Sequence, residues 1–308
     1  MSVSEQGGTA TAAGYPEHLR LEVERYLEGL RFSEETLTEG LEEAMRYSLL
    51  AGGKRIRPVL ALATAKAVGM AREEVMPLAG AIELIHTYSL IHDDLPAMDD
   101  DELRRGQPTC HVAYGEDVAI LAGDGLYAEA FRHLLSERRS PPERLLDAAL
   151  ELAAATGASG MVGGQYVDVA GTATEGGEGL RRLHELKTGR LIGASVICVL
   201  LLGGVDGRAT MYFRRFAAEL GVLFQIVDDI LDVTGTDEAL GKPQGSDERH
   251  GKRTYVSEFG IEQARRLAAE SHSTARRELA EAMLTLQRAP QQATELEQIT
   301  DFIYTRSS

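Results

Sequence analysis

The segment Ile82–Asp101, which reads IELIHTYSLIHDDLPAMDDD, joins an apolar helical run to a cluster of aspartates. A second apolar run, Leu220–Val227, is followed in the same way by DDILD at Asp228–Asp232. One such cluster alone is typical of a solvated acidic helix face. Carboxylates crowded beside apolar residues repel one another unless cations neutralise them, and Mg²⁺ held by a few carboxylates usually completes its shell with substrate phosphate oxygens. The two clusters together predict a metal site for a diphosphate substrate.

The spacing within each cluster predicts its local structure. The outer aspartates of the second cluster are four residues apart, so they share one face of a helix. Asp93 and Asp99 are six apart and would not share a face of a regular helix. Pro96 disfavours helical conformation in the residue before it. We therefore expect a turn at Leu95–Met98 that brings Asp99 back towards Asp93.

The composition excludes several classes of function. The chain has 308 residues, with 32 Lys and Arg against 48 Asp and Glu, and a formal net charge of −16. This acidity argues against a nucleic-acid partner and against adhesion to anionic membranes. The most apolar stretch, Leu191–Val205, is 15 residues long, shorter than the roughly 20 that span a bilayer, so no stable membrane insertion is expected. Two cysteines give no disulfide framework and favour the reducing cytoplasm.

Helical periodicity extends through nearly the whole chain, and no sustained alternation predicts a sheet. We expect a disordered tail over residues 1–15 and a single all-α domain over residues 16–308. The main helical blocks are expected at Val59–Val68, Glu73–His92, Glu116–Leu135, Glu143–Thr156, Leu180–Leu202, Ala209–Leu231, Ile261–Leu286 and Glu295–Tyr304. Loops are expected at Ser140–Pro142, Thr172–Gly179 and Gly203–Gly207. The connection Val233–Tyr255, with Lys242 and Lys252, is long enough to favour a lid or binding loop.

Basic residues gather near the acidic clusters in three groups. They are GGKRIRP at Gly52–Pro58, Arg104-Arg105-Gly106, and Lys187-Thr188-Gly189 with the lysines of the expected lid. Arginine binds phosphate through two parallel hydrogen bonds and lysine binds it as a point charge. Each group alone is typical of a solvated surface patch. Their association with two acidic clusters favours metal-bridged phosphates.

Two further polar residues have an ambiguous role. His86 lies seven residues, nearly two turns, before Asp93 on the expected helix, and is either a packed structural histidine or a site residue. Gln225 lies three residues before Asp228. Its neutral amide could support positive charge near the metals, or hydrogen-bond a neighbouring helix.

The chain resembles the short-chain trans-prenyl diphosphate synthases, most closely the bacterial farnesyl diphosphate synthases. Thr87–Leu126 is similar to that subgroup almost residue for residue. Further matching motifs follow in family order: GGKRIRP at Gly52–Pro58, GGQYVD at Gly163–Asp168, KTG at Lys187–Gly189, FQIVDDILD at Phe224–Asp232 and GKPQGSD at Gly241–Asp247. The resemblance extends from Leu19 to Arg306. It implies an isoprenoid synthase helical bundle, with about ten or more helices around a central cavity, usually in a homodimer.

The resemblance also implies a reaction. Isopentenyl diphosphate condenses with dimethylallyl or geranyl diphosphate, with three Mg²⁺ ions, to give farnesyl diphosphate by ionisation, condensation and elimination. The same chemistry in a deeper cavity would give geranylgeranyl diphosphate. A terpene cyclase and a non-catalytic prenyl-synthase-like binding subunit fit the sequence less well. The cyclase normally carries a single DDxxD cluster, and the binding subunit tends to lose one acidic motif.

Matching positions imply the following roles. Asp93 and Asp99 ligate two of the metal ions and Asp228 the third, with Asp94, Asp229 and Asp232 in the first or second shell. The allylic diphosphate is held by Arg104, Lys187, Lys242 and Lys252, and isopentenyl diphosphate by Lys54, Arg57, His86 and Arg105. The cation is stabilised by Lys187, Thr188 and Gln225. Chain length is set at Tyr88 and Ser89, where a bulky ring roughly 6–7.5 Å along the helix from Asp93 would form a floor, although a tyrosine that merely fills the core would also fit the pattern.

Overall fold

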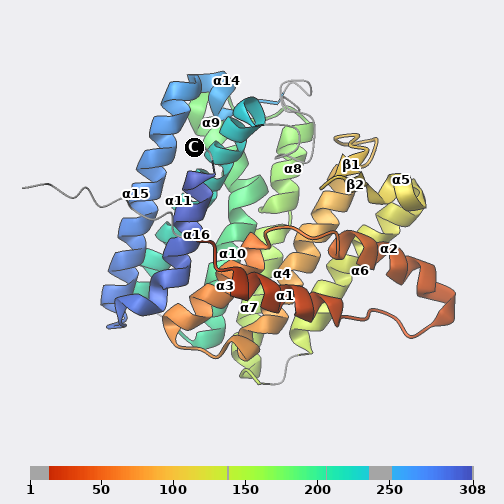
Figure 1. Cartoon of the computed structure of the whole chain (residues 1–308), viewed down its shortest axis with the longest axis horizontal. Coiled ribbons are helices and arrows are strands. Elements are labelled where there is room, and N and C mark those ends of the chain that lie inside the picture. The colour runs from red at the N-terminus through yellow and green to blue at the C-terminus, as the bar shows by residue number, and fades with distance from the viewer. Residues whose placement is uncertain (1–13, 137–138, 206, 236–251, 307–308) are drawn as a thin grey trace, which may run out of the picture.

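A computed structural model describes residues 14–136, 139–205, 207–235 and 252–306. They form a bundle of helices with one short hairpin, which confirms the predicted all-α fold (Figure 1). The helices of the first half are α1 (Glu17–Glu28), α2 (Glu39–Leu49), α3 (Ile56–Val68), α4 (Arg72–Asp93), α5 (Cys110–Tyr114), α6 (Glu116–Leu135) and α7 (Pro142–Thr156). Those of the second half are α8 (Met161–Val169), α9 (Gly176–His184), α10 (Arg190–Gly203), α11 (Gly207–Thr234), α14 (Tyr255–Phe259), α15 (Ile261–Thr285) and α16 (Thr294–Thr305). Short 3-10 turns occupy Thr36–Thr38 and Pro290–Ala293.

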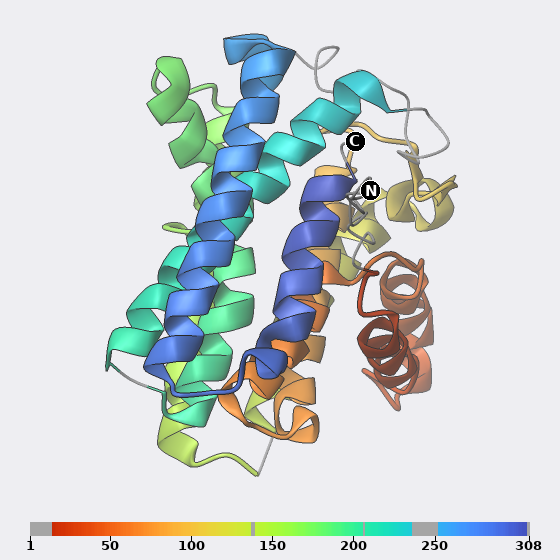
Figure 2. The same ribbon diagram turned by 60° about the vertical axis from the view of Figure 1, so that its left-hand side comes forward.

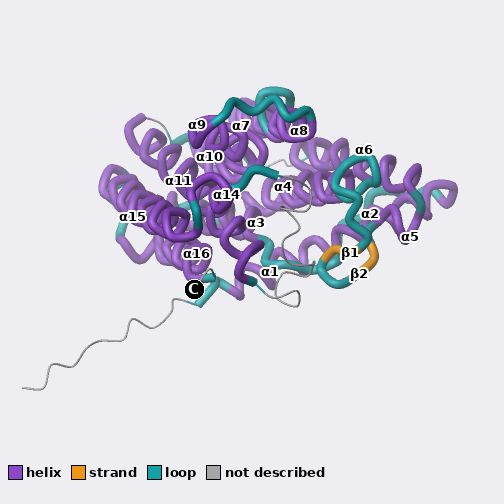
Figure 3. The backbone as a smooth tube through the Cα atoms, turned by 90° about the horizontal axis from the view of Figure 1, so that it is seen from above, coloured by secondary structure: helices purple, strands orange, loops and turns teal. Residues whose placement is uncertain are grey.

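The centre of the bundle is built from α3, α4, α10 and α11. Most residues of α3 and α10 are buried, as expected for helices that are apolar on most sides. The helix α10 packs against α3, α7 and α11, while α15 runs along α11 (Figure 2). Seen from above, α15 lies at one end of the molecule and α5 at the other (Figure 3). This arrangement leaves the carboxyl ends of α4 and α11 at the same end of the bundle (Figure 1).

The helix that carries the first acidic cluster tolerates a proline near its start. Pro77 has no N–H to donate to the carbonyl of Glu73, four residues earlier. The Arg139 side chain donates to that carbonyl instead, at 2.7 Å. A guanidinium from outside the helix thus satisfies the free acceptor, and α4 continues for 22 residues to Asp93.

The hairpin was not predicted, because its strands are only two residues long. The strands β1 (Leu103–Arg104) and β2 (Gln107–Pro108) are antiparallel and are joined by Arg105 and Gly106. Both joining residues have positive φ, 54° and 74°, which is the conformation of a type I′ turn. The Arg-Arg-Gly motif therefore forms a tight turn that fixes the direction of its two arginines.

The observed helices refine the expected blocks. The block Leu180–Leu202 is part of one continuous helical stretch, in which the π-helical segment Glu185–Gly189 separates α9 from α10. The expected loop at Thr172–Gly179 is shorter than predicted, because α9 begins at Gly176. The helices α5, α8 and α14 were not predicted. Each has nine residues or fewer, too short for a clear periodic signal.

Two expectations fall mostly outside the described residues. Residues 1–13 of the predicted tail lie outside the described ranges. Tyr15, however, packs on Phe302 with ring centroids 4.7 Å apart and donates to the Lys54 carbonyl at 2.6 Å. The chain is therefore already fastened to the bundle at Tyr15, within the range predicted as a tail. Residues 236–251 of the expected lid, including Lys242, also lie outside the described ranges.

By length and composition alone, two helical stretches, Pro142–Val169 and Gly176–Gly203, could cross a membrane. The second contains most of the 15-residue apolar run singled out above and begins well before it. In the structure, α10 within this stretch is enclosed by other helices of the bundle. Its apolar surface is thus used in the protein core.

Candidate active site

The first acidic cluster folds back on itself as predicted. The helix α4 ends at Asp93, and the Asp99 N–H donates to the Asp93 carbonyl at 2.9 Å. The Asp100 N–H donates to the Leu95 carbonyl at 3.2 Å, and Asp100 has a positive φ of 53°. The turn around Pro96 therefore brings Asp93 and Asp99 together, although they are six residues apart. This confirms the predicted local geometry.

Asp94, next to Asp93, is buried and paired with an arginine. It is 3% exposed, and its carboxylate accepts hydrogen bonds from the Arg104 guanidinium, with Nε at 2.7 Å from one oxygen and 2.9 Å from the other. Burial raises the pKa of Asp94, while the bond to Arg104 opposes the change. The structure thus pairs Asp94, predicted to lie beside the metal ions, with Arg104, predicted to hold the allylic diphosphate.

The second acidic cluster remains helical within α11. Asp228 is the most exposed of its three aspartates, with 40% of its side chain accessible, and it pairs with Arg306 at 2.7 Å. Asp229 is 1% exposed and Asp232 is 4% exposed. Asp229 accepts from the Gln225 side chain at 2.8 Å and from the Tyr255 N–H at 2.7 Å. Adjacent aspartates therefore have different environments in this cluster too.

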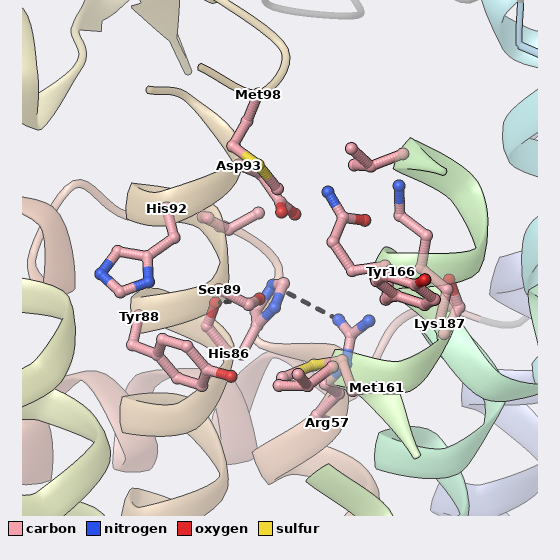
Figure 4. A pocket seen from close by; sticks show the side chains of 15 residues that line it. Arg57, His86, Tyr88, Ser89, His92, Asp93, Met98, Met161, Tyr166 and Lys187 are labelled. Carbon is pink, nitrogen blue, oxygen red and sulfur yellow. Dashed lines mark hydrogen bonds between the residues drawn. The ribbon is translucent and has the colours of Figure 1, made fainter. Parts of the chain in front are cut away.

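The two clusters face two cavities that share Lys187. The first, of about 490 Å³, has Asp93 in its wall, and the second, of about 390 Å³, has Asp228, Asp229 and Asp232. Figure 4 shows Asp93 and Lys187 on opposite sides of the first cavity. Burial raises the pKa of Asp93 to about 6, and the charge of Lys187 opposes that rise. The Lys187 side chain therefore lines both cavities, and its positive charge lies near both acidic clusters.

The position of Lys187 depends on a close approach of two helices. The π-helical segment Glu185–Gly189 packs on α8, and a Cβ on Gly164 would lie 2.3 Å from the Lys187 backbone nitrogen. Only glycine fits there. The Lys187 ammonium then reaches Asp168 on the same helix α8, at 2.6 Å. Sequence reasoning gave Asp168 no role, and its place at the end of the GGQYVD motif was the available signal.

The first cavity has a basic end, formed by Arg57 and His86. Their side chains are 3.3 Å apart, and the buried Nε of Arg57 has no hydrogen-bond partner within the described chain. Burial and the neighbouring Arg57 guanidinium hold the pKa of His86 well below its usual range, so the imidazole is neutral. Arg57 also lies over the Phe224 ring at 5.7 Å, and Arg306 lies over the same ring at 4.4 Å.

Lys54 and Arg105 lie beside this basic end rather than in the cavity wall. The Arg105 guanidinium donates to the Gly52 carbonyl, and a Cβ on Gly53 would lie 2.8 Å from the centre of that guanidinium. With φ at 126°, Gly53 is in a conformation that other residues rarely adopt. The glycines of this motif thus permit a close approach of Arg105 to the backbone. Lys54 lies over the Phe302 ring at 5.5 Å.

The remainder of the first cavity is largely apolar. Tyr88 and Ser89 line it from α4, and Met161 and Tyr166 line it from α8 (Figure 4), together with Val162. Tyr88 is 8% exposed. Behind it, the ring of Tyr127 on α6 makes an edge contact, with centroids 5.0 Å apart. The tyrosine thus closes the cavity on the side of α6.

Two basic residues from the last quarter of the chain reach the acidic clusters. Lys252 donates to Asp99 at 2.9 Å, and Arg306 donates to Asp228 at 2.7 Å. Lys252 thus contacts a predicted metal ligand, and its role in holding the allylic diphosphate stays a prediction. Arg306 was not assigned from the sequence, since the contact joins residues 78 positions apart.

Comparisons with known proteins point to one family. The polyprenyl synthetase family model matches residues 38–301. A chloroplastic geranylgeranyl pyrophosphate synthase of Capsicum annuum is 49% identical over 242 residues, which cover 78% of this chain and 66% of that protein. The farnesyl diphosphate synthase of Geobacillus stearothermophilus is 48% identical over 246 residues, covering 78% of this chain and 82% of that protein.

A solved structure supports the same assignment. The geranyltransferase of Helicobacter pylori, described as complexed with magnesium and isoprenyl diphosphate, superposes with a TM-score of 0.77 and 32% identity. The match covers 92% of this chain and 98% of that one. The motifs, the helical bundle and the paired acidic clusters all agree with these similarities, and the chain belongs to the polyprenyl synthetase family.

Proposed function

We propose that the protein is a prenyltransferase that joins isopentenyl diphosphate to dimethylallyl or geranyl diphosphate and makes farnesyl diphosphate. The observation that carries this proposal is the division of the site into an acidic part and a basic part. Asp93 lines the first cavity with Asp99 folded back against its backbone, Asp228 lines the second cavity, and Arg57 with His86 forms the basic part of the first. One diphosphate would be held through metal ions and the other by protein cations directly.

The acidic part fits Mg²⁺, provided that a substrate takes part. Asp93 and Asp99 would hold two ions and Asp228 a third, with Asp94, Asp229 and Asp232 around them. Across the described ranges, no group of three or more metal-ligating side chains is close enough to hold an ion by itself. Mg²⁺ commonly binds through one or two carboxylates and substrate phosphates. When bound, it would neutralise the leaving diphosphate.

Several cations would complete the allylic site. Lys187 lies between the two cavities, and Lys252 already contacts Asp99. Arg104 would act mainly by fixing Asp94, to which it is bound. Lys242, outside the described residues, keeps the diphosphate-binding role that its motif implies.

The basic part fits a diphosphate that does not ionise. Arg57 has a buried Nε without a partner in the described chain, and the neutral His86 beside it can donate a hydrogen bond. Lys54 and Arg105 would bind from the rim, and Arg306 would close the site over Phe224. Without a metal ion, the C1–O bond of isopentenyl diphosphate remains intact.

The reaction then follows from these positions. The C1–O bond of the allylic substrate breaks, and its electron pair leaves with the diphosphate. The double bond of isopentenyl diphosphate attacks the resulting cation at C1, and the departed diphosphate accepts the proton that is lost. Lys187 and Thr188 line the first cavity and Gln225 lines the second. The main-chain carbonyls of Lys187 and Thr188 or the Thr188 hydroxyl, with Gln225 in support, would stabilise the cation.

We assign the product length to Tyr88, backed by Tyr127. A product of fifteen carbons fits a floor at this depth. A twenty-carbon product is the second candidate, because relatives of comparable identity bear both names.

Product analysis tests both assignments. Wild-type protein, labelled isopentenyl diphosphate, Mg²⁺ and each allylic primer should give mainly farnesyl diphosphate. Tyr88→Ala should give twenty carbons or more with little change in the first condensation. Tyr212→Ala, which removes a tyrosine outside the cavity, is the control. A wild type that makes mainly a twenty-carbon product, or a Tyr88→Ala variant that stops at fifteen, would overturn the floor. Absence of any product would favour the non-catalytic subunit.

We further propose a cytoplasmic homodimer. The neighbouring helices α6 and α7 expose large apolar side chains, among them Ile120, Leu121, Leu146 and Leu150. A second copy covering this surface would remove those side chains from water. The two buried free cysteines suit a reducing compartment. Light scattering after gel filtration should give twice the mass of 33.4 kDa. The Leu146→Glu substitution should shift the protein towards the monomer.

A further inference from the structure

A chain of hydrogen bonds joins the π-helical segment to the second acidic cluster. The Thr188 hydroxyl donates to the Gln225 side-chain oxygen at 3.1 Å. The Gln225 amide nitrogen donates to Asp229 Oδ1 at 2.8 Å. Asp229 Oδ2 accepts from the Tyr255 backbone N–H at 2.7 Å. The π-helical segment, α11 and the start of α14 are thus connected through one buried carboxylate.

The chemistry of the carboxylate fixes the direction of every bond in this chain. An ionised aspartate can only accept hydrogen bonds. Gln225 must therefore turn its NH₂ group towards Asp229, which turns its oxygen towards Thr188. The Thr188 hydroxyl must then donate its single proton to Gln225. The lone pairs of the Thr188 oxygen remain available to the first cavity, which Thr188 lines.

The position of Asp229 sets it apart from Asp228. Asp229 is 1% exposed, and each of its oxygens accepts a hydrogen bond from the protein. Asp228 has 40% of its side chain exposed, and it contacts Arg306 through the long side chain of that arginine. Of these two neighbours, Asp228 is better placed to bind a metal ion, and Asp229 to orient other side chains.

We infer that Asp229 is a positioning residue that orients Gln225 and Thr188, so that the Thr188 oxygen presents its lone pairs to the allylic cation. The inference rests on the proposed prenyl transfer. Asp229 acts on the reaction through Thr188 rather than as a metal ligand. Because it also holds the Tyr255 N–H, it fixes the start of α14, close in sequence to Lys252.

The substitution Asp229→Asn reverses the chain. The asparagine NH₂ group can donate to the Gln225 oxygen, which turns the Gln225 nitrogen towards Thr188. The Thr188 hydroxyl then accepts from that nitrogen, and its proton turns towards the cavity. Losing a hydrogen bond or contact to a charged group costs about ten- to hundredfold in rate. We expect kcat to fall by that factor with an unchanged Mg²⁺ half-saturation. Asp228→Asn, the matched control, should shift the Mg²⁺ half-saturation upwards.

A double-mutant cycle tests the route through Thr188. Thr188→Val removes the hydroxyl and keeps the shape, whereas Thr188→Ser retains the hydroxyl and should keep most of the activity. If Asp229 acts through Thr188, Asp229→Asn should cost less than about threefold in the Thr188→Val background. Full additivity of the two losses, or a shifted Mg²⁺ half-saturation in Asp229→Asn, would overturn the inference.

Two controls keep the outcome interpretable. If Asp229→Asn does not fold, Gln225→Met breaks the same chain without altering Asp229. It should lower kcat about ten- to hundredfold with Mg²⁺ half-saturation unchanged, and full activity would refute the role of the chain. Wild-type protein without any prenyl transfer would refute the proposed function itself. An active wild type with an additive cycle would refute only the role of Asp229.

Discussion

The two acidic clusters have similar sequences and different backbones, yet they position their first two aspartates alike. In the first cluster the helix ends at Asp93, and in the second it continues past Asp228 to Thr234. Asp93 and Asp228 both line a cavity. Asp94 and Asp229 are both buried and are held by donors of the protein itself.

The comparison separates two tasks within each cluster. A carboxylate that faces the cavity is available to a metal ion and a diphosphate. A carboxylate that accepts several protein hydrogen bonds stabilises the surrounding structure and orients other side chains. The clusters differ in how the backbone positions the aspartate that follows these pairs. A tight turn positions Asp99, and a further turn of regular helix positions Asp232.

The largest expected effect is on turnover. Asp93→Ala and Asp228→Ala should each lower kcat by about a thousandfold or more, because several kcal/mol of charge stabilisation is lost in the transition state. Circular dichroism should show the helical fold intact in both variants. Steady-state assays with purified protein check the prediction. Near-normal turnover in either variant would show that Asp93 and Asp228 do not have equivalent roles.

A smaller effect is expected on stability at the second position. Asp94→Ala leaves the Arg104 guanidinium without its main partner. Removing one member of a buried pair costs about 3–5 kcal/mol. Because 30% of the Arg104 side chain is exposed, we expect the free energy of unfolding to fall by about 2–3 kcal/mol.

Urea titration measures this change. Asp101→Ala is the matched control, since Asp101 contacts the same Arg104 at 3.5 Å across a more exposed pair, and should cost less than about 1 kcal/mol. Equal losses in the two variants would contradict the assignment of Asp94 as the buried anchor.

The smallest effect concerns pH. Burial raises the pKa of Asp93 from 3.8 to about 6 in the folded protein, so the folded state binds this proton more tightly than the unfolded state. The resulting stabilisation is complete below about pH 3.8 and is lost as the pH rises through 6. For a half-buried residue we expect about 1–2 kcal/mol. The free energy of unfolding is measured at pH 4.5 and 7.5 for metal-free wild type and for Asp93→Asn. Between these pH values wild type should lose about 1–2 kcal/mol more than the variant. An equal change in the two proteins would contradict the prediction.

Much of the local structure could be predicted from the residues. Pro96 and the six-residue spacing predicted the turn that returns Asp99 to Asp93, and the four-residue spacing predicted the shared helix face of Asp228 and Asp232. Helices with long apolar faces were also predicted, and α6 has the expected bounds Glu116–Leu135. In these cases the cause lies within a few residues along the chain.

The partners of the site residues could not be predicted in the same way. The pairs Asp94–Arg104, Lys187–Asp168 and Asp228–Arg306 join residues 10, 19 and 78 positions apart, and each depends on how separate elements pack. The π-helical turn at Lys187 depends on the close approach of α8 rather than on local propensity. Which aspartate of a cluster faces the cavity is also decided by packing, so the motif spacing alone does not separate Asp94 and Asp229 from the metal ligands, and the resemblance left them in the first or second shell.

The central claim is that the two clusters act on one metal-bound diphosphate. Thermal unfolding with Mg²⁺, with an unreactive geranyl diphosphate analogue, and with both together tests it most directly. Each ligand completes the site of the other, so the two together should stabilise wild type by more than the sum of their separate effects; a ligand at 100 times its Kd contributes about 2.7 kcal/mol. Asp93→Ala and Asp228→Ala should each abolish the excess. Purely additive stabilisation of wild type, or an excess that survives in either variant, would contradict a shared site.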